Sequence, residues 1–123
     1  MYGVSKEQDW RFLEGRSLQQ VCIGLYDVQL GFDGDVRISV NLDSEIHPFV
    51  IQSPEGSESV ANTSDATYCA LIRLLGRTVT AAEAQEPDEL RLAFENGALL
   101  SLFDASKNYE SFTITAPGIT IVV

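Results

Sequence analysis

The chain has 123 residues, 45% of them hydrophobic and 21% charged, and its 18 acidic against 8 basic residues give a formal net charge of −10. This length and composition predict one folded domain over residues 1–123. The charge disfavours nucleic acid or an anionic membrane as a partner and favours a basic protein, although it is also an ordinary means of solubility. No apolar run approaches the ~20 residues that span a bilayer, and residues 1–12 lack the apolar core of a signal peptide, so we expect a cytoplasmic protein.

The first half of the chain predicts a short helix followed by strands. Residues 5–15, SKEQDWRFLEG, indicate a helix or a single turn that is capped by Ser5 and ends at Gly15. Between the second and third strand, Asp33 and Gly34 predict a hairpin turn in which both residues have positive φ. The expected strands, in which apolar and polar residues alternate, are 17–24, 27–32, 35–42 and 46–53.

The second half predicts the same order of elements. Residues 53–65 are polar and rich in turn formers, so we expect a loop there. A helix is expected within 62–76, with Asn62, Thr63 or Ser64 as its N-cap and Gly76 as its stop. Asn96 and Gly97 form the second hairpin signal. The expected strands are 78–85, 89–94, 98–104 and 109–116, with an additional edge strand over 118–123 that the first half lacks.

An internal repeat explains this correspondence. The phrase LGFDGDVRISV at 30–40 recurs as LAFENGALLSL at 92–102, and the similarity extends over units 5–54 and 62–123. Two copies of one supersecondary unit predict a pseudo-twofold fold, here two units of a helix and a four-stranded β-meander that share one core. The fold class is therefore α+β, mainly antiparallel β, and the periodicity leaves a two-sheet sandwich and a half-open barrel as alternatives.

Residues that could carry chemistry are scarce. Cys22 and Cys69 have no CxxC spacing and are expected to be small buried hydrophobic residues. His47 has no companions at ligand spacing, and Asp33 and Asp35 flank a turn glycine without the further ligands of a calcium loop. The sequence contains no nucleophile elbow, P-loop or dinucleotide motif. We therefore predict no catalytic residue, no metal ligand and no cofactor, and an enzyme is the less favoured class.

Two arginines occupy matching positions after the glycine that ends each helix. Arg16 and Arg77 are expected to donate to the last helix carbonyls or to a carboxylate, and the alternative is that the pair binds an anion. Glu110 has no counterpart in the first half. It is the third candidate for a cleft between the two units.

Three motifs in the second half resemble a known family. They are Leu-Leu-Gly-x-x-Val at 74–79, Leu-x-Leu-x-Phe-x-x-Gly-x-x-Leu at 90–100, and Tyr-Glu-x-aromatic-x-Ile-x-x-Pro at 109–117. The chain resembles small uncharacterised bacterial domains, and some similar acidic domains are similar to immunity proteins, which neutralise a partner toxin. The resemblance implies a shared fold and a bacterial origin. It implies no active site.

The sequence supports three hypotheses about function. The first is a non-enzymatic module that binds a protein, in its most concrete form an immunity-like inhibitor of a basic toxin. The second is a small ligand-binding or hydrolytic domain with a cleft between the repeats, lined by Arg16, Arg77 and Glu110. The third is an assembly module that forms a homo-oligomer through a free sheet edge. The acids expected to contact a basic partner are Asp27, Asp33, Asp35, Asp43, Glu45, Glu55 and Glu58.

Overall fold

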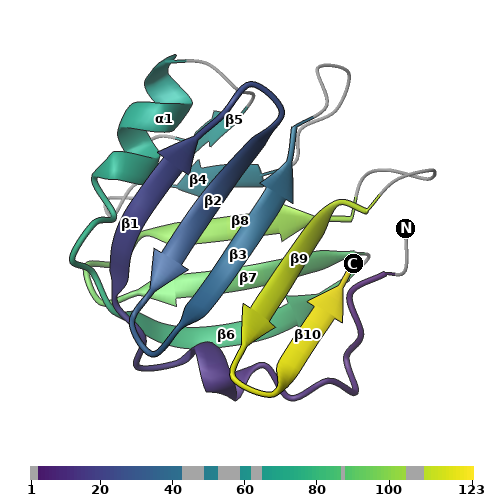
Figure 1. Ribbon diagram of the computed structural model, residues 1–123. Helices are drawn as coiled ribbons and strands as arrows, with labels where there is room; N and C mark the ends of the chain where they lie inside the picture. The colour runs from purple at the N-terminus through teal and green to yellow at the C-terminus, as the bar shows by residue number, and fades with distance from the viewer. Residues whose placement is uncertain (1–2, 43–48, 53–58, 62–64, 87, 105–109) are drawn as a thin grey trace.

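The computed structural model describes residues 3–42, 49–52, 59–61, 65–86, 88–104 and 110–123 (Figure 1). The two helical elements in this part are η1 (Arg11–Leu13) and α1 (Asp65–Ile72). The strands are β1 (Leu18–Ile23), β2 (Asp27–Phe32), β3 (Val36–Asn41), β4 (Phe49–Gln52), β5 (Ser59–Ala61), β6 (Val79–Gln85), β7 (Glu89–Phe94), β8 (Leu99–Phe103), β9 (Phe112–Ala116) and β10 (Ile119–Val122). Neither helix is long and apolar enough to cross a membrane, among the residues described.

The strands form two five-stranded antiparallel sheets, with the orders β1-β2-β3-β9-β10 and β5-β4-β8-β7-β6. The prediction of a mainly antiparallel β protein is confirmed. The sheets lie one in front of the other and their strands cross steeply (Figure 1). They do not close into a barrel, since β1, β5, β6 and β10 are edge strands in the described pairings. Helix α1 lies against β1, β4 and β5, and η1 lies against β6.

The fourth strand of each unit leaves its own meander, so the predicted four-stranded meander is wrong. β4 pairs with β8 in the other half of the chain, where Ile51 is opposite Leu100. β9 pairs with β3, where Ile38 is opposite Ile114. The physical reason is that the alternation of apolar residues decides which face of a strand is buried but not which strand becomes its neighbour.

The segment expected as a loop over 53–65 contains strand β5. It pairs with β4, as β10 pairs with β9, so the strand expected only at the end of the second half has a counterpart in the first. Position by position, the order β1-β2-β3-β9-β10 therefore corresponds to β6-β7-β8-β4-β5. Residues 53–58 and 62–64, with the expected caps of α1, lie outside the described residues.

The two halves meet at an isolated bridge between Ser17 and Thr78, just before β1 and β6. The Ser17 Oγ and Thr78 Oγ1 atoms are 2.9 Å apart. On one side of this bridge the Gly15 N–H donates to the Val79 carbonyl, and on the other the Gly76 N–H donates to the Leu18 carbonyl, both at 2.8 Å.

One hydrophobic core fills the space between the sheets. The inward positions of β2 and β7 are all buried, as their alternation predicts. Phe32 and Phe94 are both part of this core, together with Leu13, Leu18, Ile38, Leu92, Leu100, Phe112 and Ile114.

The glycines of both predicted hairpins have positive φ, 76° at Gly34 and 88° at Gly97. The turn types differ from the expectation. In the first turn the second residue with positive φ is Asp35 at 59°, not Asp33. In the second, the Gly97 N–H donates to the Phe94 carbonyl and Gly97 alone has positive φ, which is a type I turn followed by a glycine bulge.

The single turn predicted as one alternative within residues 5–15 is present as the three-residue η1, but its N-cap residue is Trp10, so the prediction of Ser5 as the cap is wrong. The expectation that both cysteines are buried is also wrong. Cys69 is exposed on α1 and Cys22 is half-buried on edge strand β1. Neither cysteine is in the core. Helix α1 and edge strand β1 each have one face that is exposed to solvent. His47 lies outside the described residues.

Candidate functional site

Asp33 holds the β2–β3 turn against the chain that precedes β1, and the Arg16 guanidinium lies beside this turn. The Arg16 Nε donates to the Phe12 carbonyl at 3.2 Å, and the Asp33 Oδ1 accepts from the Ser17 N–H at 2.6 Å. A Cβ atom on Gly34 would collide with the Arg16 guanidinium. A larger residue there would have to displace the end of this flexible side chain, so the positive φ of Gly34 is the stronger reason for glycine. The two charged side chains have structural roles at this turn.

Arg77 does not repeat the role of Arg16, although their backbones correspond. Its side chain is exposed and has no hydrogen-bond or ion-pair partner among the described residues, whereas Arg16 is half-buried. The Arg77 carbonyl accepts from the Leu18 N–H beside the start of β1. The two guanidinium groups thus have different surroundings, and the alternative that the pair binds an anion stays a prediction.

Glu110 lies at the opposite end of the first sheet. Its carbonyl accepts from the Asn41 Nδ2 at 2.5 Å, at the end of β3. Asn41 pairs with Asp27 at the start of β2, while Leu18 pairs with Phe32 at the end of β2. Glu110 is thus a full strand length from the two arginines, and the three residues do not line one cleft.

The acidic candidates that the structure describes do not form one cluster either. Asp27 begins β2, and Asp33 and Asp35 follow its end, about 20 Å away along the strand. Asp27 accepts from the Gln29 Nε2 at 3.0 Å. The remaining four, Asp43, Glu45, Glu55 and Glu58, lie outside the described residues.

The β1–β2 turn exposes apolar side chains that the sequence reasoning missed. Leu25 is 88% exposed and Tyr26 is 78% exposed, and Ile23 before them is 45% exposed. Two backbone hydrogen bonds hold this turn: the Gly24 N–H donates to the Asp27 carbonyl at 2.8 Å, and the Leu42 N–H donates to the Tyr26 carbonyl at 2.9 Å. The signal available in the sequence was an apolar pair of residues between two strands of alternating apolar and polar residues, because turns are normally polar.

The corresponding β6–β7 turn contains exposed polar residues instead, with Glu86 and Asp88 in place of the apolar pair. An exposed apolar pair is therefore not common to the described residues of both turns. Leu25 and Tyr26 are not needed for the architecture, because neither side chain is part of the core.

A groove of about 390 Å³ lies between β10 and the N-terminal segment, residues 3–10. Its wall includes Glu7, Trp10, Ile121 and Val122. The Trp10 ring is 4% exposed, and its Nε1 donates to the Ser5 carbonyl at 2.9 Å. Trp10 therefore anchors the N-terminal segment beside the sheet edge.

Two contacts fasten the far end of the N-terminal segment. The Gly3 N–H donates to the Asp104 Oδ2 at 2.6 Å, and Lys6 forms an ion pair with Glu86. Burial by itself would raise the pKa of Asp104. The hydrogen bonds to its carboxylate, among them those from Ser111 and Gly3, outweigh burial and hold the pKa below its usual value.

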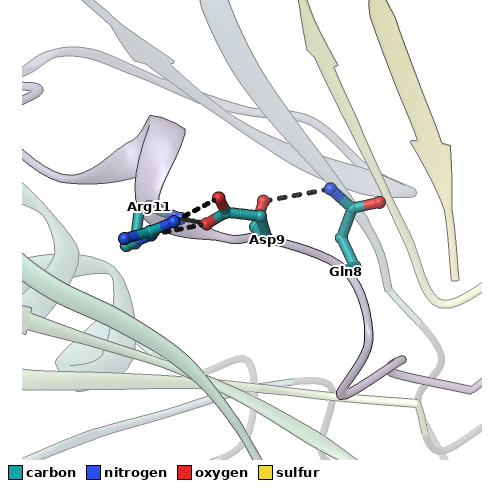
Figure 2. A network of polar contacts seen from close by, with 3 residues as sticks. All are labelled: Gln8, Asp9 and Arg11. Carbon is teal, nitrogen blue, oxygen red and sulfur yellow. Dashed lines mark hydrogen bonds and ion pairs between the residues drawn. The ribbon is translucent and has the colours of Figure 1, made fainter.

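Figure 2 shows the contacts that turn the chain from this segment into η1. Asp9 accepts from the Arg11 Nε at 3.0 Å and Nη2 at 2.9 Å, and from the Arg11 N–H at 3.0 Å. The Gln8 side chain donates to the Asp9 carbonyl at 3.0 Å. The hydrogen bonds from Arg11, side chain first and backbone second, lower the pKa of Asp9 to about 2.

A second depression, of about 330 Å³, lies on the outer face of the first sheet at Gly31. Gln20, Arg37 and Thr115 surround the glycine in one cross-strand row. The depression is open, and most of the residues around it are polar. Among the described residues, no group of three His, Cys, Asp or Glu side chains could hold a metal ion.

Comparison with known proteins gives one match. A family model described as a family of unknown function, DUF6188, matches residues 10–123. No curated protein and no solved structure matches the chain.

Proposed function

The chain belongs to the DUF6188 family, and we propose that it is a non-enzymatic binding domain for a basic protein. Because that family has no assigned activity, the proposal is argued from the surface of the molecule. In its most concrete form it is a cytoplasmic, immunity-like inhibitor of a basic toxin in a bacterium. The observation that supports this proposal best is the exposed, hydrogen-bonded apolar turn at Leu25 and Tyr26 on a chain with a net charge of −10.

The geometry of the turn suits a contact residue. Because hydrogen bonds hold the backbone of this turn, binding has to order little main chain, which is how a preorganised surface gains affinity. Tyrosine is also enriched among the residues that contribute most to protein–protein binding. Leu25 and Tyr26 would enter an apolar pocket of the partner.

The charge supports a basic partner. The chain has ten more acidic than basic side chains, so its field attracts a protein of opposite sign and accelerates encounter with it. Asp27 lies directly beside the turn and can approach a lysine or arginine at the border of that pocket. This attraction must weaken as salt screens it.

The test measures the binding of purified toxin domains of basic charge to the purified chain. We expect the double variant Leu25→Ser, Tyr26→Ser to bind at least tenfold more weakly. The matched control is Ile72→Ser, Leu75→Ser, which removes two side chains of comparable type that are 49% and 40% exposed elsewhere. Binding that does not change between low and physiological ionic strength, or that is unaffected by the turn variant, would show the proposal to be wrong.

We further propose that units 5–54 and 62–123 are pseudo-twofold copies that exchange their fourth strands to form a two-sheet sandwich. The matching strand orders and the paired hydrogen bonds around Ser17 and Thr78 support this. So does the nearly equal φ of Gly15 and Gly76, 82° and 81°. Superposing the Cα atoms of β1, β2, β3 and β4 on those of β6, β7, β8 and β9 tests it, and a fit of only some of these strands would contradict it.

The alternative of a ligand-binding or hydrolytic domain has less support. It needs Arg16, Arg77 and Glu110 at one cleft between the repeats, and these residues lie at opposite ends of the first sheet. The space between the sheets is occupied by Phe32, Phe94 and their aliphatic neighbours.

A further inference from the structure

Strand β10 has one edge that no described strand covers. It is the last strand of its sheet, and the Val123 N–H donates to the Phe112 carbonyl at 2.9 Å. Hydrogen-bonded positions alternate along an antiparallel pair. Residues 119, 121 and 123 therefore direct their backbone groups to β9, and the N–H and C=O groups of Thr120 and Val122 point away from the sheet.

The outward backbone groups of β10 can be reached from the groove beside this edge. No backbone hydrogen bond joins β10 to the N-terminal segment in the part of the chain that the structure describes, although Ile121 and Val122 line the groove together with Trp10. The opposite wall is fastened at Gly3, Lys6 and Trp10. Strand β10 beside the groove has four residues, about 13 Å of extended chain.

Strand β6, an edge strand of the other sheet, is protected. The outward N–H of Ala82 on β6 is occupied by the Glu14 Oε2 at 3.2 Å. Natural proteins commonly cover an edge in such a way to prevent pairing with another chain. β10 carries no comparable side-chain cap on its outward groups among the described hydrogen bonds.

The charge in the groove is negative. Lys6 is engaged by Glu86, and Asp9 is engaged by Arg11. Glu7 lines the groove and has no ion-pair partner among the described residues, and no basic side chain lines the groove. A cation in an occupant would find this carboxylate.

We propose that an extended, basic segment of a partner protein adds to the sheet along β10, with its backbone bonded to Thr120 and Val122, an apolar side chain over Trp10 and a cation beside Glu7. This inference rests on the proposed function, because it specifies how a basic protein partner is bound. Main-chain hydrogen bonds supply the affinity in such strand addition, and the groove supplies the selectivity. A second copy of the chain is a poorer occupant, because each copy has a charge of −10.

The experiment uses the full chain and a synthetic peptide, Lys-Val-Lys-Val-Lys, blocked at both ends. Trp10 is the only tryptophan and lines the groove, so a change in its fluorescence while the chain stays folded reports on this region. The backbone amide signals of Thr120 and Val122 report on the edge by NMR. We expect saturable changes in both signals at millimolar peptide. The matched peptides are Glu-Val-Glu-Val-Glu and a fully N-methylated form of the basic peptide, and neither should produce these changes.

Two pairs of variants complete the test. Thr120→Pro removes the outward N–H without touching a bond to β9, and we expect it to weaken peptide binding at least fivefold, whereas Thr120→Ala should not. Glu7→Lys should weaken binding similarly, whereas Glu83→Lys, at an exposed position on β6 outside the groove, should not. Should Thr120→Pro lose folded stability, the Glu7 pair and the N-methylated peptide still decide the question.

The outcomes separate this inference from the proposed function. Unchanged Trp10 and Thr120 signals, or equal binding of the N-methylated peptide, would overturn strand addition at β10. A concentration-dependent dimer that Thr120→Pro abolishes would also overturn it, since the occupant would then be a second copy. If a basic toxin domain binds the Thr120→Pro variant normally but not the Leu25→Ser, Tyr26→Ser variant, the proposed function stands and strand addition is wrong.

Discussion

Replacing Phe112 by alanine tests the strand exchange at a fully buried position. Phe112 is 0% exposed on β9 and lies opposite Val40 of β3, in the other half of the chain. Losing the burial of an aromatic ring costs about 1.5–3 kcal/mol by transfer, and the cavity left behind raises the expected loss to about 3–5 kcal/mol. Since small domains unfold with about 5–15 kcal/mol in total, this one change removes a large share of the stability.

The assay is equilibrium unfolding in guanidinium chloride, followed by circular dichroism and by Trp10 fluorescence. Trp10 lies in the first half, whereas Phe112 lies in the second. We expect the two signals to shift to lower denaturant together, with an unchanged slope, because the halves share their sheets and core. Thr113→Ala, at the adjacent half-buried position, should cost less than about 1 kcal/mol. A Phe112→Ala loss below about 1 kcal/mol, or a Trp10 transition that does not move, would refute this reasoning.

Three further predictions concern the turns, the halves and the acidic groups. Gly34→Val and Gly97→Val should each lower the free energy of unfolding by about 1 kcal/mol or more, because a β-branched residue is strained at φ of 76° and 88°, and unchanged melting temperatures would contradict this. Residues 62–123 expressed alone should not fold as a monomer, since β8 and β9 would lose β4 and β3, and a cooperative monomeric transition in calorimetry would count against it. The pKa values of Asp9 and Asp104 are lowered in the folded state. The stability that these two carboxylates contribute is therefore fully present above about pH 4 and is lost as the pH falls through their pKa values in the folded chain, about 2 for Asp9. Melting temperatures between pH 5 and 2 should therefore fall less steeply in Asp9→Asn and Asp104→Asn than in the unchanged chain, and parallel curves would show that the two groups contribute nothing.

Features that depend on a few neighbouring residues could be predicted from the sequence. Val28, Leu30 and Phe32 alternate with polar residues, and all three are buried on one face of β2. Gly34 and Gly97 have the positive φ expected of them, because only glycine adopts that conformation without strain in such turns. Backbone sterics and the two-residue period of a strand are local properties, so the chain carries them without reference to its fold.

Features that depend on distant segments were decided only by the tertiary structure. The alternation within β4 and β9 buries Phe49 and Phe112 correctly, but it cannot say that each strand pairs in the opposite half. Arg16 and Arg77 occupy matching positions in the sequence, yet only Arg16 is half-buried beside a turn glycine. The exposure of Leu25 and the groove between Trp10 and β10 likewise follow from how separate segments pack. Which strands become neighbours depends on the free energy of the whole core and on where the connections cross it. No short stretch of the sequence contains this information.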